Sequence, residues 1–371
     1  MKKMIHLFLS GSFLLFFTGC SIFVQDTYST VSTHIVAPVA EGMGLITIEN
    51  YRELVNAITY FVSEYDSTGQ IRLSGYEKEN ASTDMEEAVT EILTKTALGS
   101  YGVSAITWDV NNIMSNLEAE INITYTKEEE NFQSIQKIDG TSAMVRSISQ
   151  SIASCSPELV LQNSWSSSNR NQISSLLQRA MTDSVTSLVE IPEIHVSFHP
   201  KEGPWLILEL QFTYETSETT LLRRQELLTE ALDEQVGALW SMGSMDVFQL
   251  ILGRLSELAK YSTQGNTPYD ILLLKKGNSQ GFALTLLAFC QEMGLDALLV
   301  EGTLNGTPHY WNQITLETGE VHYVDVTIPP DEMGIYPYFG EDSLAALGYL
   351  WDQSLFPTAT EIAPDEEKAP F

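Results

Sequence analysis

The sequence predicts an α+β protein: two repeated small α+β modules followed by a different C-terminal domain. Stretches with apolar residues at helical spacing are separated by short runs in which apolar and polar residues alternate, a mixture typical of helices packed on sheets. The order of these stretches recurs about 88 residues further along the chain. With 371 residues, 43% of them hydrophobic, the chain is long enough for two or three domains of roughly 100–200 residues each.

The N-terminal segment predicts export. Lys2 and Lys3 precede the apolar run 4–17, whose 14 residues fall short of the ~20 that span a bilayer, so residues 1–19 are interpreted as a signal peptide. The ending FTGC at 17–20 resembles the lipobox of bacterial lipoproteins, which implies a lipid on Cys20. The expected location is the outer face of the bacterial cell membrane, with residues 20–43 as a tether. The alternative is an ordinary signal peptide with an incidental cysteine.

The repeated region is predicted to span 44–132 and 133–220. In each half a helix, a strand, a second helix and one or two strands follow one another. Ile71 and Leu159 are 88 residues apart, as are Leu73 and Leu161. Sequence identity between the halves is low, so the duplication is inferred from the order of elements. A third helix, predicted at 225–240, leads into the last domain, expected at 221–356.

Charge and the remaining cysteines and histidines exclude several classes of function. The chain has 49 acidic and 19 basic residues, a net charge of −30, which repels phosphate backbones, so no nucleic-acid partner is expected. Cys155 and Cys290 could pair or remain buried thiols. His195 and His199 lie in a predicted strand, where four residues span ~13 Å, too far for one ion. We therefore predict no metal and no cofactor.

Residues 277–327 contain the candidate site. A glycine-flanked turn at 277–281 precedes a helix at 282–293 that Gly294 ends. Strands are predicted near 298–300, at 309–316 and at 321–327. The turn at 305–306 is Asn-Gly, a strong hairpin signal.

The second turn sets the register of the last two strands. A three-residue loop that ends in Gly319 pairs Leu316 with Glu320, and hence Trp311 with Asp325. His309 then lies diagonally from Asp325 on one face, ~7–8 Å away at the backbone, close enough for the imidazole to meet the carboxylate. Ser279 would face this pair from a helix N-terminus, where free N–H groups favour negative charge. An ordinary hairpin and an ordinary helix cap would give the same spacing.

These residues resemble a known family. The segments GNSQGFA at 277–283, HYWN at 309–312 and YVDVT at 323–327, with Gly294 and Gly302, resemble the bacterial transglutaminase-like superfamily. The resemblance implies a papain-like fold and a cysteine–histidine–aspartate triad for acyl transfer or peptide hydrolysis. His309 and Asp325 match the histidine and the aspartate. The cleft would be lined by Gly277, Gln280, Trp311 and Asn312 and would bind a peptide or a protein.

Ser279 stands where the family pattern has the cysteine. A thiol at a helix N-terminus can ionise at neutral pH, its pKa falling from ~8.5 to as low as ~3.5. The ~0.3–1 kcal/mol that a helix end contributes is too little to ionise a hydroxyl. The sequence therefore predicts a catalytically silent domain, with an active serine-variant acyl transferase or peptidase as the alternative.

A further alternative uses the same turn. GNSQG at 277–281 is formally GxSxG, the nucleophile elbow of α/β-hydrolases, and it lies between the strand-like apolar run 271–274 and the predicted helix. Against it, His309 precedes Asp325, whereas in those enzymes the acid comes before the histidine. The acidic, proline-containing segment 357–371 is predicted to be disordered.

Overall fold

A computed structural model describes residues 40–41, 45–113, 116–163, 170–240 and 246–358. The predicted signal peptide, Cys20, nearly all of the tether and most of the acidic tail lie outside the described residues. In the part that is described, no helix combines the length and apolar character that crossing a bilayer requires. The described helices and strands form a mixed α+β protein, as the sequence predicts.

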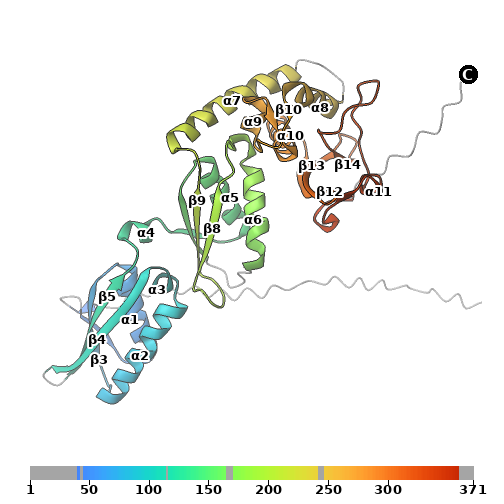
Figure 1. Ribbon diagram of the computed structural model, residues 1–371. Helices are drawn as coiled ribbons and strands as arrows, with labels where there is room; N and C mark the ends of the chain where they lie inside the picture. The colour runs from blue at the N-terminus through green and yellow to red at the C-terminus, as the bar shows by residue number, and fades with distance from the viewer. Residues whose placement is uncertain (1–39, 42–44, 114–115, 164–169, 241–245, 359–371) are drawn as a thin grey trace, which may run out of the picture.

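The first sheet, drawn in blue and cyan in Figure 1, has its own core. Its strand order is β1-β2-β3-β5-β4, and only β2 and β3 run parallel. Helix α1 begins after Asn50, whose side chain accepts from the Glu53 N–H, and buries the stripe of Leu54, Ile58 and Phe61. The elements are β1 (Ala40–Glu41), β2 (Leu45–Ile48), α1 (Tyr51–Ser63), β3 (Thr68–Leu73), α2 (Lys78–Lys95), α3 (Ala97–Gly102), β4 (Val103–Ile113) and β5 (Asn116–Tyr125).

The second sheet has the same arrangement. Its order is β6-β7-β9-β8, with β6 and β7 parallel and the other pairs antiparallel, so it matches β2-β3-β5-β4 strand for strand. The elements are α4 (Glu129–Gln133), β6 (Gln136–Ile138), α5 (Thr141–Ala153), β7 (Glu158–Asn163), α6 (Ile173–Asp183), β8 (Glu193–His199) and β9 (Ile207–Thr213), with short 3₁₀ turns at Arg170–Gln172 and Val185–Ser187.

The parallel pairs of the two sheets have the same separation along the chain. Ile46 pairs with Ile71 in the first sheet and Gln136 pairs with Leu161 in the second, so the partners are 25 residues apart in both. This separation is the same for every parallel pair, so it does not decide which residues of the two halves correspond, and the spacing of 88 residues stays a prediction. The duplication itself stays a prediction.

The C-terminal part has one four-stranded antiparallel sheet, of order β14-β13-β12-β15, with α10 packed on it. Its core is continuous with that of the second sheet, whereas a small cluster of Tyr101, Val160 and Ile207 joins the first sheet to the second. The elements are α7 (Glu218–Trp240), α8 (Val247–Leu258), β10 (Lys260–Tyr261), α9 (Pro268–Leu272), β11 (Lys276–Gly277), α10 (Ser279–Met293), β12 (Ala297–Leu304), β13 (Thr307–Thr315), β14 (Val321–Val324), α11 (Glu341–Ala346), β15 (Tyr349–Leu350) and the 3₁₀ turn Gln353–Leu355.

Three predicted boundaries are wrong near the site. The first half of the run 271–274 ends helix α9, which Thr267 caps, Pro268 starts and Asp270 stabilises through a capping box, and the second half is a turn. The strand expected at 271–274 is therefore absent, and the two-residue strand β11, which pairs parallel with β10, precedes Ser279 instead. The sheet that carries His309 is antiparallel, which does not favour the α/β-hydrolase alternative. Helix α10 begins at Ser279 rather than at residue 282, and strand β14 ends at Val324 rather than at residue 327.

The two described cysteines do not form a disulfide. Cys155 and Cys290 are both free and buried, and burial raises the pKa of each thiol. They are therefore unreactive thiols under ordinary conditions. His195 and His199 lie on strand β8, as predicted.

Candidate functional site

Ser279 is the first residue of α10, and the turn before it is tightly held. The Asn278 side chain accepts a hydrogen bond from the Gly281 N–H at 3.1 Å, which caps the helix. The Asn278 N–H donates to the carbonyl oxygen of Gly265 at 2.7 Å. A Cβ atom on Gly277 would lie 2.5 Å from the Ile271 Cδ1 and 3.0 Å from the Gly265 carbonyl oxygen, so a larger residue would force these neighbours to move. These contacts fix where Ser279 sits.

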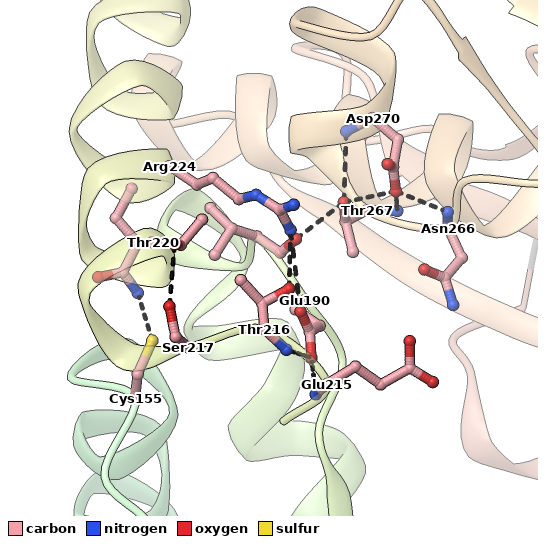
Figure 2. A network of polar contacts seen from close by, with 12 residues as sticks. Cys155, Glu190, Glu215, Thr216, Ser217, Thr220, Arg224, Asn266, Thr267 and Asp270 are labelled. Atoms are coloured by element: carbon pink, nitrogen blue, oxygen red, sulfur yellow. Dashed lines mark hydrogen bonds and ion pairs between the residues drawn. The ribbon is translucent and has the colours of Figure 1, made fainter. Parts of the chain in front are cut away.

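The loop that holds Asn278 is itself braced, as Figure 2 shows. The Asp270 carboxylate accepts hydrogen bonds from the Asn266 N–H at 2.9 Å, the Thr267 N–H at 3.1 Å and the Thr267 hydroxyl at 2.8 Å. Beside it, Arg224 of α7 lies 3.8 Å from the Glu190 carboxylate, at the end of the second sheet's module. Arg224 also lies over the Tyr269 ring at 5.3 Å, and the Thr267 hydroxyl lies 3.5 Å from the Val189 carbonyl oxygen, so the second module and α7 contact the helix α9 that precedes the turn.

The hairpin brings His309 and Asp325 together as predicted. Asn312 pairs with Val324 and Gln313 with Tyr323, which is the register that the Gly319 loop requires. The His309 Nε2 lies 2.6 Å from the Asp325 Oδ2. Both residues are buried, with 7% and 4% of their surfaces exposed.

Asp325 is satisfied on both oxygens. The Tyr349 hydroxyl donates to Oδ2 at 2.6 Å, and Thr327 donates its N–H at 2.8 Å and its hydroxyl at 2.7 Å to Oδ1. The Thr327 contacts bend the chain away from the sheet, which explains why β14 ends early. Burial alone would raise the pKa of Asp325, but hydrogen bonding and charge from His309, with Tyr349 and Thr327, lower that pKa below its usual value. Asp325 is therefore a carboxylate at neutral pH.

The Ser279 hydroxyl lies against strand β13 but is not joined to the imidazole. Its Oγ accepts a hydrogen bond from the Tyr310 N–H at 3.3 Å. Among the described residues, no hydrogen bond joins the Ser279 hydroxyl to the His309 imidazole. Because the imidazole uses Nε2 for Asp325, Nδ1 is the nitrogen left to act on a neighbour. The structure brings all three predicted residues to one place, with serine and histidine unconnected.

The predicted cleft-lining residues have different roles. Trp311 is 1% exposed and packs its ring against Tyr349, 5.0 Å away between centroids. Asn312 is fully buried and donates to the Ala283 carbonyl oxygen of α10 at 3.0 Å, which ties the helix to the sheet. Gly277 is buried, while Gln280 is half-buried. Trp311 and Asn312 therefore pack and brace the site rather than line an open cleft.

Sequence reasoning missed two groups at the site. Tyr349 reaches Asp325 from β15, and nothing in the local sequence connects the two. The Tyr310 N–H is a backbone donor, visible only once the helix and the strand are placed together. Thr327 gave a signal, since threonine two residues after an aspartate is typical of a side-chain-to-backbone turn.

The described residues include no cluster of three or more histidine, cysteine or acidic side chains that could hold a metal ion. His309 and Asp325 are committed to each other, and Ser279 offers a neutral hydroxyl. The arrangement is suited to positioning a proton or a carbonyl group.

No family model matches this chain, and no curated protein matches it. Among solved structures it is similar to a transglutaminase, with TM-score 0.26 and 12% identity, covering 46% of this chain and 51% of that one. It is also similar to a candidate cysteine protease from Cytophaga hutchinsonii, with TM-score 0.26 and 13% identity, covering 44% and 68%. Menin, solved with its binding site for the MLL protein, gives TM-score 0.22 and 18% identity, covering 32% and 30%.

The chain thus spans about half the length of that transglutaminase. These likenesses are weak.

Proposed function

We propose that the C-terminal part of this protein is a degenerate transglutaminase-like domain that binds a peptide or protein segment and does not react with it. The observation that carries the proposal is the Ser279 hydroxyl, which is held by the Tyr310 N–H and makes no hydrogen bond to His309. A general base must lie within about 2.6–3.2 Å of the group whose proton it takes, directly or through one water. A hydroxyl without that contact stays a weak nucleophile.

Burial supports the same proposal. Ser279 is 5% exposed and His309 7% exposed, so a scissile bond has little access to either group. The His309–Asp325 pair is fixed by Tyr349 and Thr327, as a structural pair would be. A peptide ligand is what the resemblance of the segments 277–283, 309–312 and 323–327 to transglutaminase-like proteins implies.

An active serine-variant acyl transferase or peptidase is the second candidate. The observation in its favour is the intact pair, in which Nε2 of His309 faces Asp325 and Nδ1 is free to serve Ser279 after a small movement. A fluorophosphonate probe separates the two candidates. We expect no labelling of the full chain above the background of Ser279→Ala; labelling that requires Ser279 would reject the silent site.

The cysteine variant tests the shape of the site. In Ser279→Cys the helix N-terminus and His309 should lower the thiol pKa, so iodoacetamide should modify it at pH 6. Ser174→Cys, at an exposed position of α6, is the matched control and should react slowly at that pH. Equal rates for the two variants would show that the residues do not form a transglutaminase-like site.

We also propose that the protein is exported and anchored through lipid on Cys20. Each buried CH₂ of a lipid chain contributes ~0.8 kcal/mol, so two or three chains hold a protein at a membrane. Labelled palmitate should enter the wild-type protein and not Cys20→Ala, and the variant should leave the membrane fraction. Equal labelling of both would contradict the anchor.

A further inference from the structure

Strand β12 has a free outer edge. It pairs with β13 from Ala297 to Leu304, but with β15 only at Thr303 and Leu304. In the part of the chain that the structure describes, no strand lies beside residues 297–302 on that side. An exposed apolar edge of this kind is rare because its backbone groups can pair with another chain.

The hairpin turn shows which backbone groups face this edge. Both residues of the turn 305–306 have positive φ, 52° and 81°, as in a two-residue type I′ hairpin. Leu304 and Thr307 then form the hydrogen-bonded pair that closes the loop, and such pairs alternate along the strands. Leu299 and Glu301 therefore direct their N–H and C=O groups away from β13, toward the outer edge.

A slot of about 350 Å³ runs along this edge, and we call it the β12 slot. Its floor includes Leu298, Leu299 and Glu301, one wall is helix α6 of the second module, and the other is the chain at 352–356. The edge from residue 298 to 302 is about 13–17 Å long at ~3.3 Å per residue. The slot thus has the form that a short added strand requires.

The side chains of the slot indicate what such a strand would carry. Leu298 is 40% and Leu355 is 69% exposed, so both offer apolar surface. Arg179 of α6 also lines the slot, and among the described residues its guanidinium makes no hydrogen bond or ion pair. Glu301 and Asp352 also line the slot, but Glu301 already accepts hydrogen bonds from Gln178 and Tyr310, and Asp352 accepts from Ser354. The Arg179 guanidinium, which lacks such a partner among the described residues, favours a carboxylate ligand.

We propose that the β12 slot binds an extended peptide of another protein, which adds to β12 as a strand. The peptide's main chain would bond to Leu299 and Glu301, an apolar side chain would contact Leu298 and Leu355, and an acidic group would meet Arg179. The chain's own segment after residue 358 is the competing occupant, and truncation separates it from a partner peptide. This inference goes beyond the proposed function, because peptide binding at β12 does not depend on Ser279.

A synthetic strand tests the proposal. A fluorescein-labelled octapeptide of alternating valine and glutamate should bind the full chain and slow hydrogen exchange at the Leu299 and Glu301 amides. The same peptide methylated on every backbone nitrogen should bind at least tenfold more weakly, because it cannot donate to the edge. Equal binding of the two peptides, or no binding of the first at 1 mM, would overturn the proposal.

Variants of the slot give a second measurement. Arg179→Glu and Leu355→Asp should each weaken binding of the octapeptide at least threefold. The matched controls Arg146→Glu, on the exposed side of α5, and Met333→Asp, 80% exposed elsewhere, should leave it unchanged. Ser279→Ala should also leave it unchanged, so failure here is distinct from failure of the proposed function.

Truncation after residue 358 tests whether the chain's own C-terminal segment occupies the β12 slot. If removal of that segment speeds hydrogen exchange at Leu299 and Glu301, the chain's own C-terminus fills the slot and the partner-peptide proposal is rejected. We expect no change.

Discussion

The His309–Asp325 pair and the His199–Glu209 pair have the same parts in different surroundings. In both, the imidazole Nε2 contacts a buried carboxylate, at 2.6 Å in the first and 3.1 Å in the second. The first pair lies beside Ser279 on the C-terminal sheet. The His199–Glu209 pair lies on the second sheet and contacts Ser100 and Lys127 of the first module.

In the His199–Glu209 pair, both ring nitrogens of the histidine and the carboxylate of the glutamate have polar partners. The His199 Nδ1 lies 3.1 Å from the Ser100 carbonyl oxygen and its Nε2 lies 3.1 Å from the Glu209 carboxylate, so both ring nitrogens face oxygen atoms. Glu209 also accepts from the Lys127 ammonium at 2.6 Å, and the Tyr101 ring packs edge-on against His199. This imidazole is a fixed brace between modules.

The comparison shows that a buried imidazole–carboxylate pair is not by itself evidence for catalysis. What differs is the second ring nitrogen, which a backbone carbonyl holds in His199 and which no hydrogen bond among the described residues holds in His309. Position differs as well, because His309 lies next to a helix N-terminus. The predictions below test this difference.

Loss of Asp325 should have the largest effect. Asp325→Ala leaves His309, Tyr349 and Thr327 without their buried acceptor, and breaking a buried pair typically costs about 3–5 kcal/mol of folding free energy. Urea unfolding followed by tryptophan fluorescence measures the change. Asp233→Ala, at an exposed position of α7, is the control. A loss below 1 kcal/mol would mean that the pair does not hold the sheet.

Glu209→Gln should have a smaller, local effect. Hydrogen bonds to charged groups contribute about 1.5–3 kcal/mol, and the partially exposed Lys127 and His199 can turn toward water. Since the first module has its own core, hydrogen exchange should rise at residues 126–135 between the sheets while the core of the first module stays protected. Loss of protection throughout the first module would contradict this independence.

Acid should weaken both pairs. Burial raises the pKa of Glu209, but Lys127 and His199 outweigh it, so the pKa of Glu209, like that of Asp325, lies below its usual value. The unfolded chain then binds more protons, and stability falls as pH drops from about 5 through the unfolded values near 4. Glu209→Gln should flatten the slope by up to about 1.4 kcal/mol per pH unit. An unchanged slope of folding free energy against pH would show that Glu209 does not contribute to the loss of stability in acid.

Ser279→Ala should have the smallest effect on stability. It removes one acceptor, that of the Tyr310 N–H, worth about 0.5–1.5 kcal/mol. A working nucleophile is often held at the expense of stability, so its removal tends to stabilise the fold. A rise in melting temperature would therefore favour the active serine candidate.

Local sequence was enough for the elements around the site. Glycine at 319 and Asn-Gly at 305–306 predicted both hairpins and the register that joins His309 to Asp325. Gly294 predicted the end of α10. The apolar run 271–274 was misassigned because periodicity does not separate a short helix from a strand; the capping box of Thr267 and Asp270 was the better signal.

The sequence by itself determined many of the helices and strands, the turns of the last two hairpins and the serine at the nucleophile position, because these depend on residues close in the chain. It missed the strand that begins each module, β2 and β6, because these strands are only four and three residues long. Only the tertiary structure decided that Tyr349 reaches Asp325, that Lys127 meets Glu209 and that one edge of β12 stays unpaired. Both side-chain contacts join residues that are far apart in the sequence, and the unpaired edge depends on which strands become neighbours. No local periodicity or spacing encodes either feature.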